Sequence, residues 1–430
     1  MGYTELVEKR GNMKIIQIPR RFVIDKWGCS ETFITETSAR MNSRGFSSEI
    51  MTTTVLCDVP EEEYRGIRIR RFPYSYPYFG LTQHDRQQLD NKADNLFSFS
   101  LLRALRREKD VDIIHLNTGK LLGSIGRVIA RRRHIPYVIS QHSKNFTANN
   151  EKTETWTEPA KGIFEWGKLL GLLYGSRKVL EDAAAVICDG REEYTMISRK
   201  YPNKRVVHLP NGVDLNKFAA AGDGVWFRKM YKIPDDRFLI LNAARIDPQK
   251  NQLSLVRQLP DILDKAPDAH LLCIGNVTDN QYYDKVLKEI AIQKLEDHVT
   301  IIPGLPYDGP DLINAYKAAD CFVLPSLHEP FCMGVLEAWA AGLPVAVAKR
   351  GGLPYIVEQE KNGLLFDPEA PARFKESAKD AILTLILDEE ARKGYAKAGY
   401  EEVTSKYSWD SITDSLIDLY KEIGTDTVTT

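Results

Sequence analysis

Residues Ser326–Pro354 read SLHEPFCMGVLEAWAAGLPVAVAKRGGLP and carry the strongest structural signal in the chain. A Pro-containing loop leads into the first turn of a predicted helix, whose unpaired backbone N–H groups favour an anion. Val345–Val347 then predicts a short buried strand, and Gly351-Gly352 allows a turn that a side chain would block. Two carboxylates, Glu329 and Glu337, flank the helix start. The pattern predicts a diphosphate site with a carboxylate on either side.

The composition is that of an ordinary soluble globular protein. At 430 residues, with 43% hydrophobic and 27% charged residues, the chain is long enough for two or more domains. No apolar run approaches the ~18 residues that cross a bilayer, and no signal-peptide pattern opens the chain. We therefore expect a cytoplasmic protein, with peripheral membrane contact as a further option. The cysteines form no C-x-x-C pair, so neither a disulfide framework nor a zinc site is indicated.

Charge is divided unevenly along the chain. Residues 1–210 hold 34 Lys and Arg against 25 Asp and Glu, whereas residues 211–430 hold 24 against 34. Much of the basic excess falls between Arg103 and Arg133, where the chain predicts an amphipathic helix. Such a surface suits an acidic membrane or an acidic acceptor, and a solvated helix face is the alternative. We expect no nucleic-acid partner.

Strand-like and helix-like segments alternate through the first half of the chain, which predicts a parallel sheet covered by helices on both faces. The predicted strands are Lys14–Ile18, Ser48–Val55, Ile113–Leu116, Tyr137–Ser140 and Ala184–Cys188, and the predicted helices are Glu31–Ser43, Leu122–Arg132 and Leu169–Leu180. The aromatic loop Tyr74–His84 is either part of an acceptor pocket or a packed surface loop.

A second series of the same type follows the turn residues Pro210–Asp214, which suit a connection between domains. Its predicted strands are Phe238–Asn242, His270–Ile274, Val299–Ile302, Cys321–Leu324 and Val345–Val347. Trp409–Ile423 then repeats apolar residues at helical spacing, so one face of this helix must pack on another element. The sequence therefore predicts two Rossmann-like halves and a closing helix.

An ordered set of short motifs extends the opening stretch in both directions. The motifs are NGVD at Asn211–Asp214, ARIDPQKN at Ala244–Asn251, AADCFVLPS at Ala318–Ser326, GLPV at Gly342–Val345 and GLL at Gly363–Leu365. An E-x7-E spacing alone, as between Glu329 and Glu337, would be weak evidence. With the whole set in order, the chain resembles family 4 retaining glycosyltransferases of the GT-B fold nearly end to end.

The resemblance implies an α/β fold in which two Rossmann-like, doubly wound domains face a central cleft. Residues 1–207 would form the acceptor-binding domain, with residues 1–12 as an extension. Residues 208–407 would form the domain that binds the nucleotide-sugar donor. The C-terminal helix, residues 408–423, would cross back to the first domain.

The same resemblance implies transfer of a hexose from a UDP- or GDP-sugar to a hydroxyl of a sugar or glycoconjugate acceptor. The anomeric configuration would be retained through attack from the front face, with the departing phosphate oxygen helping to deprotonate the acceptor. Because no D-x-D motif stands at a strand end in a suitable context, we expect no essential metal ion. No cofactor is expected, since the nucleotide sugar is a substrate.

Four side chains of the second half are the main candidates for donor binding. Arg245 and Lys250 follow a predicted strand end, where open parallel sheets bind ligands, and the resemblance assigns both to the diphosphate. By the same resemblance Glu329 would contact the hydroxyls of the transferred sugar and Glu337 those of the ribose. The backbone N–H groups of Met333, Gly334 and Val335 are candidates for the distal phosphate. Surface cations and ordinary helix-cap acids are the alternative interpretations.

The first half contributes two candidates. Gly28 stands where the family places a glycine-rich loop near the donor phosphates, although Cys29 occupies the position of a second glycine in many relatives. A simple turn before a helix is the alternative. His142 aligns with a family histidine near the reacting sugar and completes the predicted catalytic set with Glu329, Arg245 and Lys250. A purely structural histidine is the alternative there.

Two departures from the family pattern put the sugar selectivity in doubt. Cys332 replaces the glycine usual after Glu-Pro-Phe, and Tyr355 occupies a position that is often acidic. A disaccharide phosphorylase on the same scaffold is the second enzymatic interpretation, and a noncatalytic glycan- or membrane-binding module is a third. A nicotinamide dehydrogenase is remote, because no G-x-G-x-x-G follows the first strand.

Overall fold

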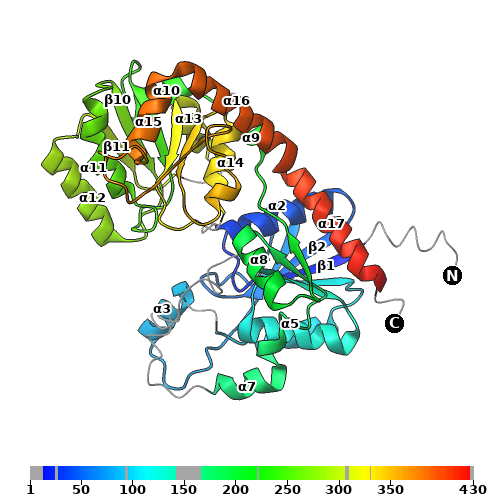
Figure 1. Cartoon of the computed structure of the whole chain (residues 1–430). Helices are drawn as coiled ribbons and strands as arrows, with labels where there is room; N and C mark the ends of the chain where they lie inside the picture. Colours follow the sequence, from blue (N-terminus) through cyan, green and yellow to red (C-terminus); the bar gives the residue numbers. More distant parts are fainter. Residues whose placement is uncertain are drawn as a thin grey trace. The chain divides into compact units, whose positions relative to one another are not determined.

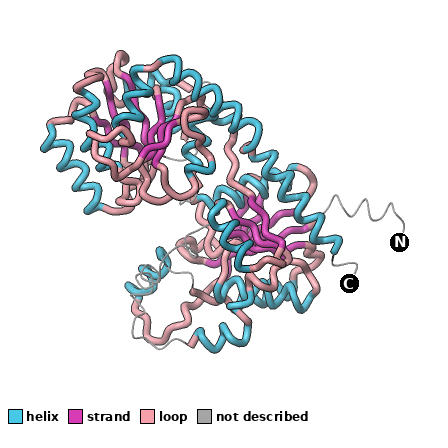
Figure 2. The backbone as a smooth tube through the Cα atoms, viewed as in Figure 1, coloured by secondary structure: helices cyan, strands magenta, loops and turns pink. Residues whose placement is uncertain are grey.

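The computed structural model describes residues 13–24, 28–92, 95–141, 166–219, 222–305, 309–329 and 331–426. The chain divides into two compact units. Unit 1 comprises Met1–Asn211 with Trp409–Thr430, and unit 2 comprises Gly212–Ser408. Each unit is a sheet with helices packed on it (Figures 1 and 2), as the alternation of strands and helices predicts.

The sheet of unit 1 has eight strands in the order β3-β4-β2-β1-β5-β6-β7-β8. Their bounds are β1 Lys14–Ile18, β2 Ser47–Thr53, β3 Glu61–Tyr64, β4 Ile67–Phe72, β5 Ile113–Leu116, β6 Tyr137–Gln141, β7 Ala185–Cys188 and β8 Arg205–His208. The helices are α2 Cys29–Ser43, α3 Gln83–Lys92, α4 Phe99–Arg107, α5 Lys120–Arg133, α7 Gly167–Tyr174, α8 Arg191–Lys200 and α17 Trp409–Asp426. All pairs of neighbouring strands are parallel except β3 with β4.

The sheet of unit 2 has six parallel strands in the order β11-β10-β9-β12-β13-β14. Their bounds are β9 Phe238–Ala243, β10 Ala269–Ile274, β11 Val299–Ile302, β12 Cys321–Leu324, β13 Val345–Ala348 and β14 Leu364–Phe366. The helices are α9 Leu215–Ala219, α10 Gly224–Met230, α11 Gln252–Leu263, α12 Asn280–Gln293, α13 Pro310–Ala318, α14 Met333–Ala340, α15 Ala378–Leu387 and α16 Glu389–Lys406. The central strands are buried along their length, as expected for a sheet covered on both faces.

Helix α17 belongs to the core of unit 1, although it follows the whole of unit 2 in the sequence. Trp409 is buried and its ring lies edge-on to Phe33 of α2, with ring centroids 6.2 Å apart. His115 of β5 links this helix to the sheet, because its Nδ1 lies 2.6 Å from the Tyr420 hydroxyl and its Nε2 lies 2.6 Å from Ser140 Oγ. The predicted return of the C-terminal helix to the first half is therefore confirmed.

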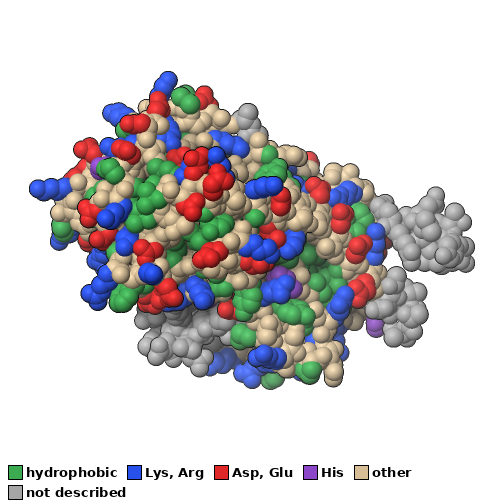
Figure 3. Space-filling view, turned by 45° about the horizontal axis from the view of Figure 1, so that its top comes forward, with side chains coloured by type: hydrophobic (Ala, Val, Ile, Leu, Met, Phe, Trp, Pro, Cys, Tyr) green, Lys and Arg blue, Asp and Glu red, His purple; other side chains and the backbone are tan. Residues whose placement is uncertain are grey.

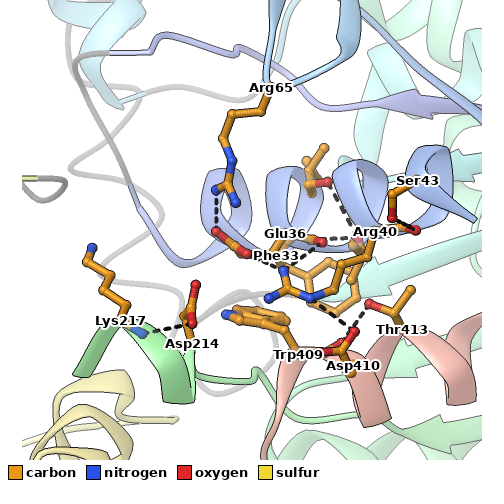
Figure 4. Close-up of polar contacts among 12 residues, drawn as sticks. Phe33, Glu36, Arg40, Ser43, Arg65, Asp214, Lys217, Trp409, Asp410 and Thr413 are labelled. Atoms are coloured by element: carbon orange, nitrogen blue, oxygen red, sulfur yellow. Dashed lines mark hydrogen bonds and ion pairs between the residues drawn. The ribbon is translucent and has the colours of Figure 1, made fainter. Parts of the chain in front are cut away.

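An ion-pair network joins the same two helices at the surface (Figure 4). Glu36 of α2 pairs with both Arg40 and Arg65. Asp410 of α17 lies 3.5 Å from Arg40 Nε and 2.7 Å from Arg44 Nη2. The pairs that cross between the helices end on Asp410, whose side chain is 68% exposed, so they contribute little individually and the buried aromatic contacts supply most of the stabilisation of α17.

Several expected element boundaries differ from the structure. The helix predicted at Leu169–Leu180 ends at Tyr174, because Gly175 adopts a left-handed conformation (φ +63) and a short 3₁₀ turn, Ser176–Lys178, follows. Strands β3, β4, β8 and β14, and with them the hairpin of β3 with β4, were not predicted. β3 reads EEEY on the sheet edge, where exposed charged residues conceal the usual strand pattern.

Within the described residues, no helix combines the length and the apolar character that a membrane crossing requires. Four cysteines, Cys188, Cys273, Cys321 and Cys332, are buried free thiols, and Cys57 is a partly exposed one. Burial raises the pKa of Cys188 to about 12, so this thiol stays protonated at neutral pH.

His270 at the start of β10 makes the stability of unit 2 depend on pH. It is 3% exposed, and burial together with Arg237 and His298 lowers the pKa of His270 to about 4. Because the ordinary histidine pKa is ~6.5, the unfolded chain binds a proton that the folded chain rejects, and stability falls as pH drops from about 6.5 toward 4. The unchanged chain should lose unfolding free energy when the pH falls from neutral to mildly acidic values. In His270→Gln we expect this loss to be smaller by about 2 kcal/mol.

Urea unfolding of the full chain at several pH values measures this effect. The exposed His84 of unit 1 gives a matched control, since His84→Gln should leave the pH dependence of unit 2 unchanged. An unaltered pH slope in His270→Gln would show that another group governs acid unfolding.

Candidate functional site

The loop after β9 carries two cationic side chains, those of Arg245 and Lys250. Arg245 is half exposed, and its Nη2 lies 3.2 Å from Asp247 Oδ2. The other Asp247 carboxylate oxygen accepts a hydrogen bond of 3.0 Å from the Lys250 backbone N–H, which closes the turn. Gln252 of α11 fixes the start of the loop by donating to the Arg245 carbonyl at 2.8 Å. The loop geometry therefore comes from local hydrogen bonds and leaves about half of the Arg245 side chain accessible.

Lys250 and Glu329 form a buried ion pair. Their side chains are only 13% and 8% exposed, and the Lys250 ammonium contacts Glu329 Oε2 directly. Burial disfavours the Lys250 charge, but the neighbouring Glu329 carboxylate outweighs this effect and raises the pKa of Lys250 above its ordinary value. Ser326 Oγ also donates to the same carboxylate oxygen, at 3.4 Å. The site thus holds one fixed positive and one fixed negative charge side by side.

Two short segments hold the backbone around Glu329. The Gly352 N–H donates to the Glu329 carbonyl at 2.6 Å. Gly351 has φ +56, and a Cβ there would lie 2.5 Å from the same carbonyl oxygen, so this position requires glycine. Gln249 donates its side-chain amide to the His328 carbonyl at 2.8 Å. These contacts explain why Gly351-Gly352 accompanies Glu329 in the sequence.

Helix α14 begins beside this pair. No oxygen side chain caps this helix, because its N-cap residue is Cys332 and its first turn contains no acidic residue. The Val335 N–H acts on the Cys332 thiol, which is a weak acceptor. Burial raises the pKa of Cys332 to about 12, and the charges of Glu329 and Lys250 also act on this thiol, which places the ion pair next to the helix start. Gly334 lets the helix approach β12 closely, since a Cβ there would lie 3.1 Å from Phe322 Cζ.

Glu337 lies one turn further along α14. It is buried, with 7% exposed, and its Oε2 accepts a hydrogen bond of 2.8 Å from the hydroxyl of Tyr316 on α13. Tyr316 was not singled out from the sequence. A buried tyrosine needs an acceptor for its O–H, but no sequence pattern links two residues 21 positions apart on different helices.

Unit 2 therefore assembles most of the predicted donor-site residues at the carboxyl ends of its strands. Arg245 and Lys250 stand on the loop after β9, Lys250 contacts Glu329 before α14, and Glu337 stands on α14 itself. Met333, Gly334 and Val335 supply the first-turn backbone of that helix. Fixed cationic side chains beside the first-turn backbone N–H groups of a helix can together bind an anion.

The two candidates from the first half stand apart from this cluster in the sequence. Gly28 is the N-cap residue of α2 in unit 1, with an extended backbone (φ −136). A Cβ at Gly28 would lie 2.9 Å from the Glu31 carboxylate, which itself lies 3.7 Å from Arg21 Nε. His142 lies outside the described residues.

Both halves of the chain match known family models. Residues 30–217 match the model described as Glycosyltransferase Family 4, and residues 227–402 match Glycosyl transferases group 1. A D-inositol 3-phosphate glycosyltransferase of Saccharomonospora viridis is 28% identical over 408 residues, which are 92% of this chain and 89% of that protein. An uncharacterized glycosyltransferase of Methanocaldococcus jannaschii is 27% identical over 386 residues, which are 87% of this chain and 89% of that protein.

Solved structures show the same fold at low sequence identity. Sucrose-phosphate synthase from Thermosynechococcus elongatus matches with a TM-score of 0.71 and 20% identity, over 96% of this chain and 100% of that one. Anabaena HepE in complex with UDP-glucose matches with a TM-score of 0.68 and 17% identity, over 95% and 100%. The expected fold of two Rossmann-like, parallel-sheet domains is therefore confirmed.

Proposed function

We propose that this chain, which has the GT-B fold and a glycosyltransferase domain in each half, transfers a hexose from a UDP- or GDP-sugar to an acceptor hydroxyl with retention of configuration. One observation carries the proposal. The buried Lys250–Glu329 pair adjoins a helix start that no oxygen side chain of that helix caps. Such a site matches the charge and the hydroxyl pattern of a sugar attached to a diphosphate.

Each side chain has a defined task in this reaction. Lys250 and Arg245 stabilise the negative charge that grows on the leaving diphosphate, and the first-turn N–H groups of α14 bind its distal phosphate. Glu329 accepts hydrogen bonds from the hydroxyls of the transferred sugar. Glu337 accepts hydrogen bonds from the ribose, while Tyr316 holds one of its oxygens in place.

The proposed reaction needs no nucleophile from the protein. The bond from the anomeric carbon to the phosphate oxygen breaks, and a new bond to the acceptor oxygen forms on the same face. The acceptor proton moves to the departing phosphate oxygen. The protein contributes fixed charges to this step, which are worth most in a site that excludes water.

A thermal-shift screen of nucleotides tests the donor assignment. A ligand bound only by the folded chain at 100 times its Kd adds about 2.7 kcal/mol of stability. We expect UDP or GDP, and the corresponding nucleotide sugars, to raise the melting temperature, and Lys250→Met to abolish the shift. Stabilisation by inorganic phosphate with no response to nucleotides would instead favour the disaccharide phosphorylase.

The nucleotide sugar identified by the thermal shift is then used as donor, and sugar transfer to each of a set of candidate acceptors is measured. D-inositol 3-phosphate is the first acceptor to include, because relatives that cover most of the chain carry its name. We expect turnover to persist in EDTA, since the proposed site neutralises the diphosphate with Arg245, Lys250 and backbone N–H groups. Strict Mn²⁺ dependence would refute the metal-independent mechanism and leave the donor assignment standing.

A further inference from the structure

Helix α7 in unit 1 exposes a row of leucines. Leu169, Leu172 and Leu173 are 64%, 80% and 69% exposed. The other face of the helix is anchored, because Leu170 and Tyr174 pack against the core of unit 1, and α7 lies beside α5 (Figure 1). The leucines are therefore held outward by a packed helix, which is unusual for three large apolar side chains of a soluble domain.

Aromatic residues extend this apolar surface at the start of α7. Phe79 is 62% exposed, and its ring lies 6.4 Å from that of Trp166, the residue that precedes the helix. The Trp166 N–H donates to the Pro77 carbonyl at 3.1 Å, which fixes the Phe79 loop to α7. Tryptophan and phenylalanine beside exposed leucines are typical of protein surfaces that enter the interfacial region of a bilayer.

Helix α4, which packs on α5 as α7 does, adds a basic face to unit 1. Arg103, Arg106 and Arg107 are exposed on one side of α4 and, with the 59% exposed Phe99, line a groove of about 820 Å³. Phe97 connects the two helices, since its ring centroid lies 4.8 Å from that of Phe99 and 5.2 Å from that of Tyr174. The arginine face and the leucine row therefore belong to two helices of unit 1 that both pack on α5.

No acidic residue interrupts the charge of these helices. The segments 97–107, 120–133 and 166–178 contain Lys and Arg but neither Asp nor Glu. By contrast, acidic and basic side chains are intermixed over the face of unit 2 that Figure 3 shows. Asp182, which lies outside these segments, pairs with Arg127 and Arg131 of α5. Among the described residues no carboxylate forms an ion pair with the arginines of α4, so the positive charge of α4 stands beside the outward apolar side chains of unit 1 without a local counterion.

We propose that α4 and α7 form a docking surface for an anionic lipid bilayer. The exposed side chains of this docking surface are Phe79, Leu169, Leu172 and Leu173, which enter the interface, and Arg103, Arg106 and Arg107, which bind lipid phosphates. Apolar insertion and electrostatic attraction together give stable peripheral binding where either alone is marginal. A second copy of the chain fits less well, because a symmetric contact would bring positive charge against positive charge. The proposal does not depend on the donor site in unit 2.

Co-sedimentation of the full chain with vesicles tests the docking surface. We expect binding to vesicles of phosphatidylglycerol mixed equally with phosphatidylcholine, and little binding to phosphatidylcholine alone. Binding should weaken about fivefold for each arginine removed, hence roughly 25-fold for Arg103→Gln/Arg107→Gln. Leu172→Glu/Leu173→Glu should weaken it more than about tenfold, because these side chains would no longer enter the interface.

Helix α12 of unit 2 supplies matched controls. Leu287 and Ile292 are 41% and 65% exposed, so Leu287→Glu/Ile292→Glu changes two exposed apolar residues outside the docking surface. Lys285→Gln/Lys288→Gln removes two exposed charges in the same way. All four variants alter exposed side chains, so their melting temperatures should stay close to that of the unchanged chain, and the control variants should bind vesicles normally.

Three results would overturn the proposal. The first is equal loss of vesicle binding in the α12 controls, which would show a general charge effect. The second is binding that the leucine variant retains and that soluble polyglutamate removes, which would show simple anion attraction. The third is a dimer in solution that Leu172→Glu/Leu173→Glu dissociates, which would make this surface a contact between copies.

Discussion

Replacing Glu329 by glutamine is expected to lower turnover by at least about 100-fold, the range seen when one charge-stabilising group of a preorganised site is removed. The amide keeps the shape of the side chain but loses the negative charge that pairs with Lys250. The Lys250 ammonium is then buried without its counterion, so its pKa falls and its position is no longer fixed. Turnover with the donor identified by thermal shift, together with a melting curve, measures both consequences.

An exposed ion pair of unit 2 provides the control. Glu358 and Lys361 form a contact of 2.7 Å, but their side chains are 56% and 66% exposed. Glu358→Gln should therefore change neither turnover nor melting temperature. A fully active Glu329→Gln enzyme would remove Glu329 from the proposed catalytic set.

Replacing Gly275 by alanine is expected to give the largest loss of stability in unit 2. A Cβ at this position would lie 1.9 Å from the Ala244 carbonyl oxygen and 2.5 Å from the Ala244 carbonyl carbon. Both are backbone atoms, and the Ala244 N–H already donates to Ile274 at 2.8 Å, so the strand ends cannot separate easily. We expect unfolding free energy to fall by about 3 kcal/mol, the upper range for overpacking a close contact.

The same change should weaken nucleotide binding, because Ala244 immediately precedes Arg245. The thermal shift with the preferred nucleotide measures this second effect in the protein that remains folded. Gly394 in α16 is the matched control, since a Cβ there meets nothing within 4 Å. Gly394→Ala should be neutral or stabilise by up to ~1 kcal/mol. A Gly275→Ala chain that melts like the unchanged protein would show that β9 and β10 are more deformable than their hydrogen bonds indicate.

The parallel sheets were predictable because their central strands are short apolar runs bounded by turn residues. Ile113–Leu116, Val299–Ile302 and Cys321–Leu324 have the predicted bounds. Strand β8, Arg205–His208, was missed because its RVVH sequence is half exposed at the sheet edge and shows no buried run. Edge strands receive less of the burial that creates a sequence signal.

The site was predictable in its members but not in its contacts. The order of the motifs predicted that Arg245, Lys250, Glu329 and Glu337 belong to one site. In the structure they lie at the carboxyl ends of the strands of unit 2. The direct pairing of Lys250 with Glu329 could not be predicted, because the two residues are 79 positions apart and meet only through the parallel order of β9 and β12. The hydrogen bond from Tyr316 to Glu337 could not be predicted either, because these residues are 21 positions apart on different helices.

Because α17 is the last helix to be synthesised, the two units complete their folding at different times during translation. Unit 2 is one uninterrupted segment and can complete its core as soon as Ser408 has left the exit tunnel. Unit 1 is interrupted, so the pocket that receives Trp409 and Tyr420 stays unfilled throughout the synthesis of unit 2. Until then Phe33 lacks the ring of Trp409 that covers it and His115 lacks the hydroxyl of Tyr420, so chaperone protection would matter most in this interval.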